Sequence, residues 1–153
     1  NDVVPFWKDW ETLKLYLELE QLRSNYKFSY TLQADDELLN GHYKIPPLII
    51  QPYIENAIHH GLNPLSDRKG ELFLKAEIKN TVLEFTIKDN GIGRKKAGQK
   101  NSVTPSHQSY GLQLTKERIH LFNEKRGNDI VIKDLADENG QATGTTVTVL
   151  LHI

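Results

Sequence analysis

The sequence predicts an α+β fold, a two-layer α/β sandwich in which helices cover one face of a mostly antiparallel, mixed sheet. Two observations lead to this prediction. Segments with strand-like alternation come in adjacent pairs, and segments with helical spacing do not alternate regularly with them as in a doubly wound sheet. The 153 residues are enough for one domain with a core and too few for two ordinary domains.

The N-terminal segment predicts a helix from Pro5 to about Tyr26, because apolar residues recur there every three or four positions. These residues form two stripes: Phe6, Trp10, Leu13 and Leu17 in one, and Leu15, Leu19 and Leu22 in the other. Two stripes indicate burial on two sides. The helix is therefore either an ordinary core helix or a connecting helix that also packs against a neighbouring segment outside this sequence.

A strand and a second helix are expected next. Residues 27–34 alternate apolar and polar side chains, which is typical of a half-buried strand, and residues 35–43 are expected to form a turn region. A helix is expected over 48–60, with apolar residues on one face and a stop at Gly61. Pro52 lies in its first turns, where a missing N–H donor costs least.

Two hairpins are expected in the C-terminal half. Residues 71–79 and 81–89 alternate cleanly on either side of a short turn, and residues 129–137 and 144–153 form a second strand pair. Between the hairpins, residues 94–110 show neither helical nor strand periodicity. A loop of this length in a small domain is usually functional or disordered, and we expect it to be mobile.

A third helix is expected from about Leu112, because apolar residues follow at roughly helical spacing until Gly127. Gly111 stands just before this expected start. Free backbone N–H groups and the helix dipole favour a phosphate group at such a position.

Composition excludes several classes of function. The formal net charge of −1 gives no overall field that would attract nucleic acid or an anionic membrane. The chain has no cysteine, which excludes disulfides, thiolate nucleophiles and Cys-ligated zinc. No apolar run has the roughly 18 to 20 residues of a membrane helix. There is also no methionine, so we expect the sequence to be a piece of a longer protein.

The helix expected over 48–60 carries polar residues opposite its apolar face: Glu55, Asn56, His59 and His60. One interpretation is a solvated surface. A second is a zinc site, although these residues lack the usual histidine spacing and there is no third ligand nearby. A third is that the Asn56 side-chain oxygen occupies one position around a Mg²⁺ ion that also binds phosphates.

The loop over 94–110 is strongly basic. It contains no Asp or Glu, and its positively ionisable residues are Arg94, Lys95, Lys96, Lys100 and His107. A solvated surface loop is the simplest interpretation. Together with Asn56 and Gly111, however, this segregation of charge points to a polyphosphate ligand.

The segment "DNGIG" follows the first hairpin and begins with Asp89. A turn needs one permissive residue, whereas Gly91 and Gly93 provide two. A carboxylate at a strand end can accept a hydrogen bond from an exocyclic amine, and the glycines let a flat ring approach the backbone. These residues therefore predict an adenine site.

Four segments, in order, resemble the N, G1, G2 and G3 boxes of the Bergerat ATP-binding fold: "QPYIENAIHHG", "DNGIG", "YGLQL" and "GTTVTV". Histidine kinases, gyrase B, Hsp90 and MutL share this fold. More narrowly, "PPLIIQPYIENAIHHG" after "LKLYLELEQLRSNYKFSY" is similar to the catalytic domain of LytS-type sensor histidine kinases. The resemblance covers the chain from about Leu13 to Ile153.

The resemblance implies a set of residues that bind Mg-ATP: Asn56, His59, His60, Asp89, Gly91, Gly93, Gly111, Leu112, Arg118 and Thr145. In this set Asn56 ligates Mg²⁺, and Asp89 binds the adenine amino group with help from Thr145. Gly111 and Leu112 flank the phosphates. The resemblance further implies that 1–26 is a connecting helix, that 27–153 is the ATP-binding domain, and that about 94–110 is an ATP lid.

Two positions depart from the family pattern. Members that hydrolyse ATP usually carry a carboxylate four residues before the Mg²⁺-binding Asn, and here that residue is Pro52. Gln113 stands where histidine kinases often have a second glycine. Glu55 and Asn56 remain the candidate catalytic residues. His59 occupies a position where Lys is common, so its phosphate contact would depend on pH.

The resemblance implies a protein histidine kinase domain that transfers the γ-phosphoryl of Mg-ATP to a histidine outside this sequence, because no segment here resembles the "NPHFLFN" acceptor motif. It also implies an upstream dimerisation and phosphoacceptor segment, a homodimer when intact, and a response regulator partner. The domain would be the cytoplasmic part of a bacterial inner-membrane sensor, without membrane contact of its own. The alternatives are a Bergerat ATPase that drives dimer closure and a nucleotide-binding module without phosphotransfer.

Overall fold

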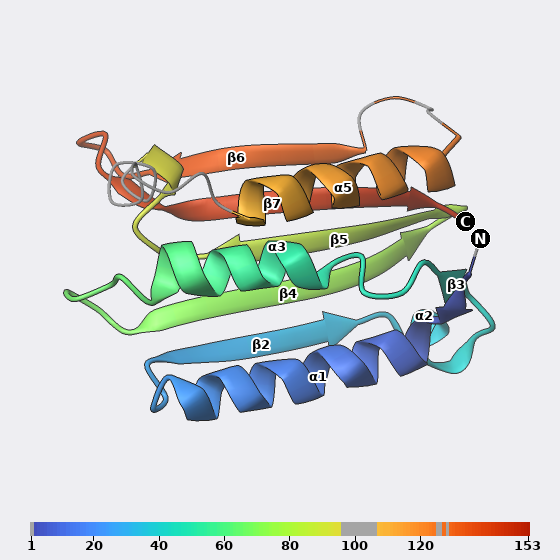
Figure 1. Ribbon diagram of the computed structural model, residues 1–153, viewed down its shortest axis with the longest axis horizontal. Coiled ribbons are helices and arrows are strands. Elements are labelled where there is room, and N and C mark those ends of the chain that lie inside the picture. Colours follow the sequence, from blue (N-terminus) through green and yellow to red (C-terminus); the bar gives the residue numbers. More distant parts are fainter. Residues whose placement is uncertain (1, 96–106, 125–126, 128) are drawn as a thin grey trace.

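The chain forms two layers, with three longer helices lying in front of one sheet (Figure 1). The computed structural model describes residues 2–95, 107–124, 127 and 129–153. The helices are α1 (Phe6–Arg23), α3 (Gln51–Asn56) with its continuation η1 (Ala57–Leu62), and α5 (His107–Phe122). This arrangement confirms the predicted two-layer α+β sandwich with helices on one face.

Within the described residues the main sheet has five strands in the order β2-β4-β5-β7-β6. They are β2 (Phe28–Ala34), β4 (Gly70–Lys79), β5 (Val82–Asp89), β6 (Ile130–Ala136) and β7 (Ala142–His152). The β2–β4 pair is parallel and the other pairs are antiparallel, so the sheet is mixed, as predicted. Both predicted hairpins, β4–β5 and β6–β7, are confirmed.

The core fills the space between the helices and the sheet. Alternate residues of β5 point into it, including Phe85 and Ile87, and Ile54 and Ile58 meet them from the α3 side. Phe6 of α1 stacks on Phe85 with ring centroids 6.1 Å apart, which fastens the first helix to the same core. None of the helices within the described residues is long and apolar enough to cross a membrane.

Only one of the two α1 stripes is used by the core. The stripe that begins at Phe6 is buried throughout, whereas Leu15, Leu19 and Leu22 are each 60% exposed. The helix ends at Arg23, slightly earlier than predicted, because Asn25 and Tyr26 have positive φ angles.

In the described part of the chain, three short elements were not expected from the sequence. Residues 35–43, predicted to be a turn region, contain the helix α2 (Asp36–Asn40), whose Leu38 is buried in the core. The two-residue strands β1 (Val4–Pro5) and β3 (Lys44–Ile45) pair with each other. Such short elements lack enough residues to show a period, so tertiary contacts determine them.

The second helix differs from its predicted 48–60 bounds at both ends. It starts only at Gln51, because Leu48 has a φ of +55° and interrupts any helical path before it. It then continues beyond Gly61 as the π-helical segment η1, where the Asn63 N–H donates to the Ile58 carbonyl at 2.8 Å. This wider turn accommodates an extra residue and is frequent at functional sites.

The third helix begins earlier than predicted. α5 starts at His107 instead of near Leu112, so Gly111 lies inside the helix and does not precede it. The polar residues from His107 to Gly111 carry no apolar period, which is why the sequence did not reveal this first turn. The rest of the predicted basic loop, 96–106, lies outside the described residues.

Candidate functional site

The Asp89 carboxylate ends strand β5 and is buried, with only 6% of the residue exposed. Its Oδ1 accepts a hydrogen bond from the Gly91 N–H at 2.8 Å. Burial raises the pKa of Asp89 to about 6, although backbone N–H groups of Gly91 and Thr145 act in the opposite direction. A buried carboxylate with a perturbed pKa at a strand end is a candidate residue of a functional site.

Thr145 lies directly opposite Asp89 in the β5–β7 ladder and is also buried. Its neighbour Gly144 has a φ of +143°, and a Cβ added there would lie 1.9 Å from the Asp89 carbonyl oxygen. The two strands can therefore meet this closely only because residue 144 is glycine. The structure thus places Asp89 and Thr145, two of the residues that the resemblance implied, side by side.

The "DNGIG" segment lies against the end of η1. A Cβ on Gly91 would approach the backbone of Gly61 to 2.5 Å, and the Ile92 N–H donates to the Gly61 carbonyl at 3.1 Å. Gly93 has a φ of +87°. Gly91 therefore allows a close backbone contact between the strand end and the helix that carries Asn56, and a Cβ on Gly93 would lie 2.8 Å from the Ala142 Cβ of β7.

Arg68 and Asn90, neither of which the sequence analysis identified, hold this segment in place. The Asn90 Oδ1 accepts from the Glu71 N–H at 2.7 Å, and its Nδ2 donates to the Lys69 carbonyl at 3.1 Å. Arg68 donates to the carbonyls of Asn90 and Gly91. An Asn after an Asp is a frequent turn residue, but nothing in the local sequence shows that Arg68 reaches it.

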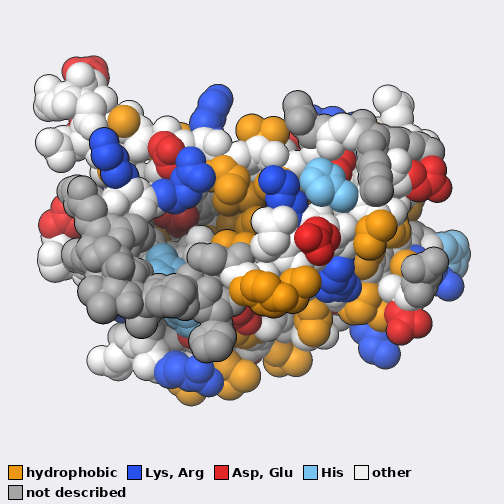
Figure 2. Space-filling model, turned by 45° about the horizontal axis from the view of Figure 1, so that its top comes forward, with side chains coloured by type: hydrophobic (Ala, Val, Ile, Leu, Met, Phe, Trp, Pro, Cys, Tyr) orange, Lys and Arg blue, Asp and Glu red, His pale blue; other side chains and the backbone are white. Residues whose placement is uncertain are grey.

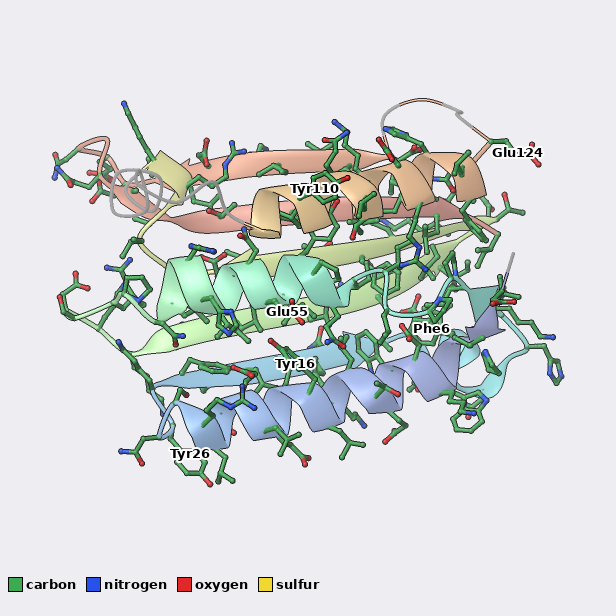
Figure 3. All side chains as sticks on the ribbon, in the orientation of Figure 1. Phe6, Tyr16, Tyr26, Glu55, Tyr110 and Glu124 are labelled. Atoms are coloured by element: carbon green, nitrogen blue, oxygen red, sulfur yellow. The ribbon has the colours of Figure 1, made fainter. Side chains whose placement is uncertain are left out.

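The predicted polar residues of α3 and η1 are Glu55, Asn56, His59 and His60, and Asn56 is half-buried. Glu55 accepts a hydrogen bond from Gln51 Nε2 at 3.1 Å, and His59 Nε2 lies 3.4 Å from Glu20 of α1. Figure 3 shows Glu55 on the side of α3 that faces α1. Glu55 and His59 therefore take part in the contact between helices.

Tyr16 of α1 lies in the same interhelical space as Glu55 (Figure 3). Its hydroxyl is buried and has no hydrogen-bond partner among the described residues. Burial raises the pKa of Tyr16, and the nearby carboxylates of Glu20 and Glu55 raise it further. For His60 the effect of burial has the opposite direction: burial lowers the pKa of this histidine, because it disfavours the charged form, and the neighbouring His59 lowers it further.

The predicted residues of α5 lie in different surroundings. Leu112 packs against the core, and the Gly111 carbonyl accepts from Thr115 Oγ1 at 2.9 Å. Arg118 Nη2 donates to the Pro47 carbonyl at 2.9 Å. Pro47 precedes α3, whereas Gly61, which approaches Asp89, follows it. Arg118 is therefore bound near the end of this helix that is remote from Asp89.

Gly111→Ala should stabilise the free domain by about 0.5 to 1 kcal/mol, because a Cβ there meets nothing within 4 Å and alanine is the better helix former. If residue 111 also flanks the phosphates, ATP affinity should fall while the melting temperature rises. Thermal denaturation with and without Mg-ATP measures both effects. A lower melting temperature of the free protein would contradict the helical assignment.

The first cation of the predicted lid is paired. Arg94 forms two bonds to Asp134 of β6, from Nε to Oδ1 and from Nη2 to Oδ2, both at 2.8 Å. The carboxylate raises the pKa of Arg94, and the guanidinium lowers the pKa of Asp134. Lys96 and Lys100 lie outside the described residues. The predicted lid is thus basic in sequence, but its first residue, Arg94, is paired with an acidic side chain of β6.

The surface shows no simple charge segregation on the face seen in Figure 2, where Lys and Arg side chains lie among Asp and Glu. A groove of about 520 Å³ lies at the end of α5, lined by Glu117, His120, Leu121 and Gly127. It contains none of the predicted site residues. In the described part of the chain, no group of three or more His, Asp or Glu side chains is arranged to hold a metal ion.

Comparisons with known proteins agree with this fold. The chain is 33% identical over 135 residues to the sensor protein LytS of Oceanobacillus iheyensis, covering 88% of the chain and 20% of that protein. It is 29% identical over 130 residues to the sensor histidine kinase YesM of Bacillus subtilis, covering 83% of the chain and 21% of YesM. The chain thus spans about a fifth of the length of these relatives. No protein-family model matches it.

Among solved structures, the catalytic domain of histidine kinase ThkA superposes with a TM-score of 0.62 at 11% identity, over 99% of this chain and 94% of that one. The fold is that of histidine kinase catalytic domains. The sequence is similar to the corresponding part of LytS-type sensor histidine kinases, in agreement with the four sequence boxes.

Proposed function

We propose that this domain binds Mg-ATP and transfers the γ-phosphoryl group to a histidine in an upstream segment of the same protein. One observation carries the proposal: a buried carboxylate, Asp89, lies at a glycine-lined strand end in a histidine kinase catalytic fold. Residues 1–26 would connect the upstream segment to the ATP-binding domain over 27–153.

The adenine end of the proposed site fits its ligand. Asp89 and Thr145 are adjacent, buried hydrogen-bonding side chains, and Gly91, Gly93 and Gly144 allow close packing around them at positions where a Cβ would clash with neighbouring protein atoms. A carboxylate acceptor distinguishes a purine with an exocyclic amine from one with a carbonyl at the same position. ATP and ADP should therefore bind, and GTP should bind much more weakly.

The phosphate end is assigned from the chemistry of its donors. The Asn56 side-chain oxygen suits one position around Mg²⁺, which supplies charge neutralisation when bound. His60, Gly111 and Leu112 are the proposed phosphate contacts. His59, which lies beside Glu20, and Arg118, which bonds Pro47, are weaker candidates in this conformation.

Transfer to a protein side chain is favoured over ATP hydrolysis. Pro52 replaces the carboxylate that activates water in hydrolysing members of the fold. Glu55, the remaining candidate base, is bonded to Gln51 and faces α1. Phosphoryl transfer depends chiefly on positioning and charge neutralisation, so it does not require such a base. Glu55→Ala should leave phosphotransfer within about tenfold of wild type.

Partners follow from the same proposal. A solved complex contains ThkA with the response regulator TrrA, and its ThkA chain shares this fold with a TM-score of 0.56. We propose a response regulator as the phosphoryl acceptor of the intact kinase, and a homodimer held by its upstream segment. The parent protein would be a membrane sensor with this domain in the cytoplasm.

The function is tested by joining the domain to its natural upstream segment and incubating the protein with γ-labelled ATP. An acid-labile, alkali-stable phosphoprotein is expected. Nucleotide binding without a phosphoprotein would indicate a binding module, and rapid phosphate release by the domain alone would indicate an ATPase. Titration with ATP, ADP and GTP, with and without Mg²⁺, tests the proposed ligand directly.

Asn56→Ala should reduce phosphotransfer by about 100-fold or more, because removing one group that positions charge in the reaction typically costs roughly 10² to 10³ in rate. Nucleotide affinity should change by less than about tenfold, because the adenine end is untouched. Asn40→Ala, at an exposed site on α2, is the matched control. Equal activity of Asn56→Ala and wild type would remove Asn56 from the metal site.

A further inference from the structure

Arg68 holds the turn that follows β5 through two successive backbone carbonyls. It lies in the loop between η1 and β4, and its Nε and Nη2 donate to the Asn90 carbonyl at 3.1 and 2.7 Å. Nη2 also donates to the Gly91 carbonyl at 3.1 Å. The remaining nitrogen, Nη1, donates to the exposed Asp67 carboxylate at 3.0 Å. The planar fork of an arginine is able to hold two carbonyls in this way, whereas a lysine offers a single point of charge.

The Asn90 carbonyl belongs to the same peptide group as the Gly91 N–H. A trans peptide group is planar, so its C=O and its N–H point in opposite directions. Arg68 binds the carbonyl on one side, and the Gly91 N–H donates to Asp89 Oδ1 at 2.8 Å on the other. Because Gly91 lacks a Cβ, rotation of this peptide group is less restricted than it would be beside another residue. The bonds from Arg68 therefore determine where the N–H points.

The contact with Arg68 also makes the Gly91 N–H a stronger donor. A carbonyl that accepts hydrogen bonds from a cation is polarised, and hydrogen bonds connected in this way strengthen one another. The bond from the Gly91 N–H favours the ionised form of Asp89, against the effect of burial. Arg68 therefore supports the ionised carboxylate through one intervening peptide group.

The rest of the turn is held by contacts that do not involve Arg68. The Asn90 side chain bonds the Glu71 N–H and the Lys69 carbonyl, and the Asn90 N–H donates to the Glu71 carbonyl at 3.2 Å. These contacts fix the position of the turn, but not the direction of the peptide group that follows Asn90. Loss of the Arg68 side chain should therefore leave the fold intact and release that peptide group.

We propose that Arg68 is a positioning residue for nucleotide recognition, which orients the Asp89 carboxylate through the peptide group between Asn90 and Gly91. The inference rests on the proposed function, because that function assigns adenine binding to Asp89. It adds a residue from the loop after η1 to the proposed site. This loop therefore links the helix that carries Asn56 to the adenine end of the site.

Titration calorimetry with Mg-ATP measures the effect on binding. Arg68→Ala should raise the Kd roughly 3- to 10-fold, the range expected for one misdirected hydrogen bond. Arg68→Lys keeps the charge but not the planar fork, and it should show most of this loss. Lys69→Ala removes an exposed cation from the same loop and is the matched control, for which wild-type affinity is expected. Wild-type affinity in Arg68→Ala, or full recovery in Arg68→Lys, would overturn the proposal.

A second measurement needs no nucleotide, so it separates this inference from the proposed function. Carbon NMR of the free protein should give a higher pKa for the Asp89 carboxyl in Arg68→Ala than in wild type, because the Gly91 N–H bond that lowers this pKa is lost. Lys69→Ala should show no comparable rise. An equal pKa in Arg68→Ala and wild type would refute orientation by Arg68, whatever the protein binds. A wild-type protein that binds no ATP would instead refute the proposed function, even if the pKa of Asp89 rises in Arg68→Ala.

Discussion

Asp89→Asn is expected to weaken ATP binding by about 1.5 to 3 kcal/mol, which corresponds to a rise in Kd of roughly 10- to 150-fold. The wild-type carboxylate is an acceptor only, whereas an amide presents both a donor and an acceptor to the adenine amine. Because the site is buried, a mismatched group cannot be compensated by water. Titration calorimetry at pH 7.5 measures the change.

The same substitution should stabilise the protein without nucleotide. The pKa of Asp89 is about 6 in the fold, compared with an ordinary value of 3.8. Between these values the folded state binds more protons than the unfolded state, so stability falls as pH rises through this window and stays lower above pH 6. The amide of the Asp89→Asn variant carries no charge to bury. The variant should therefore gain up to about 3 kcal/mol relative to wild type above pH 6 and little below pH 4.

Weak binding in a more stable protein would separate loss of recognition from loss of folding. In wild type, ATP affinity should also fall as pH decreases below about 6, because protonated Asp89 has lost its negative charge and is a weaker acceptor for the adenine amine. Asp36→Asn, at an exposed site in the first turn of α2, is the control and should change neither quantity. Unchanged affinity of Asp89→Asn would exclude Asp89 from the adenine site.

Local sequence predicted the elements in which burial follows a regular period. The hairpin β4–β5 alternates buried and more exposed residues over most of its length, so its two strands were predicted from the sequence. The π-helical segment η1 was not, because its wider turn depends on contacts around Gly61 that come from the segment after β5. The first turn of α5 also escaped prediction, since its polar residues carry no period.

The candidate site also contains residues that local sequence predicted and contacts that it did not reveal. Asp89, Gly91 and Thr145 were proposed because they lie in short ordered boxes, and the structure brings Asp89 and Thr145 together. The partners of Arg94 and His59 were not identified, because Asp134 and Glu20 are about 40 residues away in sequence. Ion pairs between distant segments leave no local pattern. For this reason the sequence suggested phosphate contacts for basic residues that lie beside carboxylates in this conformation.

Gly144→Ala is expected to destabilise the domain by about 3 to 5 kcal/mol, the largest effect on folding among the changes considered. Two costs combine. The φ of +143° is unfavourable for an L side chain, and the new Cβ would lie 1.9 Å from the Asp89 carbonyl oxygen. Since that oxygen belongs to the backbone, strands β5 and β7 would have to separate. A shift of about 2 to 4 °C per kcal/mol predicts a fall in melting temperature of roughly 6 to 20 °C.

Gly140→Ala is the matched control, because Gly140 also has a positive φ, of +77°, but a Cβ there meets nothing within 4 Å. It isolates the conformational cost, which should be about 1 to 2 kcal/mol. The difference between the two variants then measures the contact with Asp89. Any Gly144→Ala protein that remains folded should also bind ATP poorly, because the clash displaces the backbone of the residue proposed to bind adenine. Equal melting temperatures for the two variants would show that β7 does not approach Asp89 this closely. The close contact that holds Asp89 beside Thr145 in the proposed adenine site would then be absent.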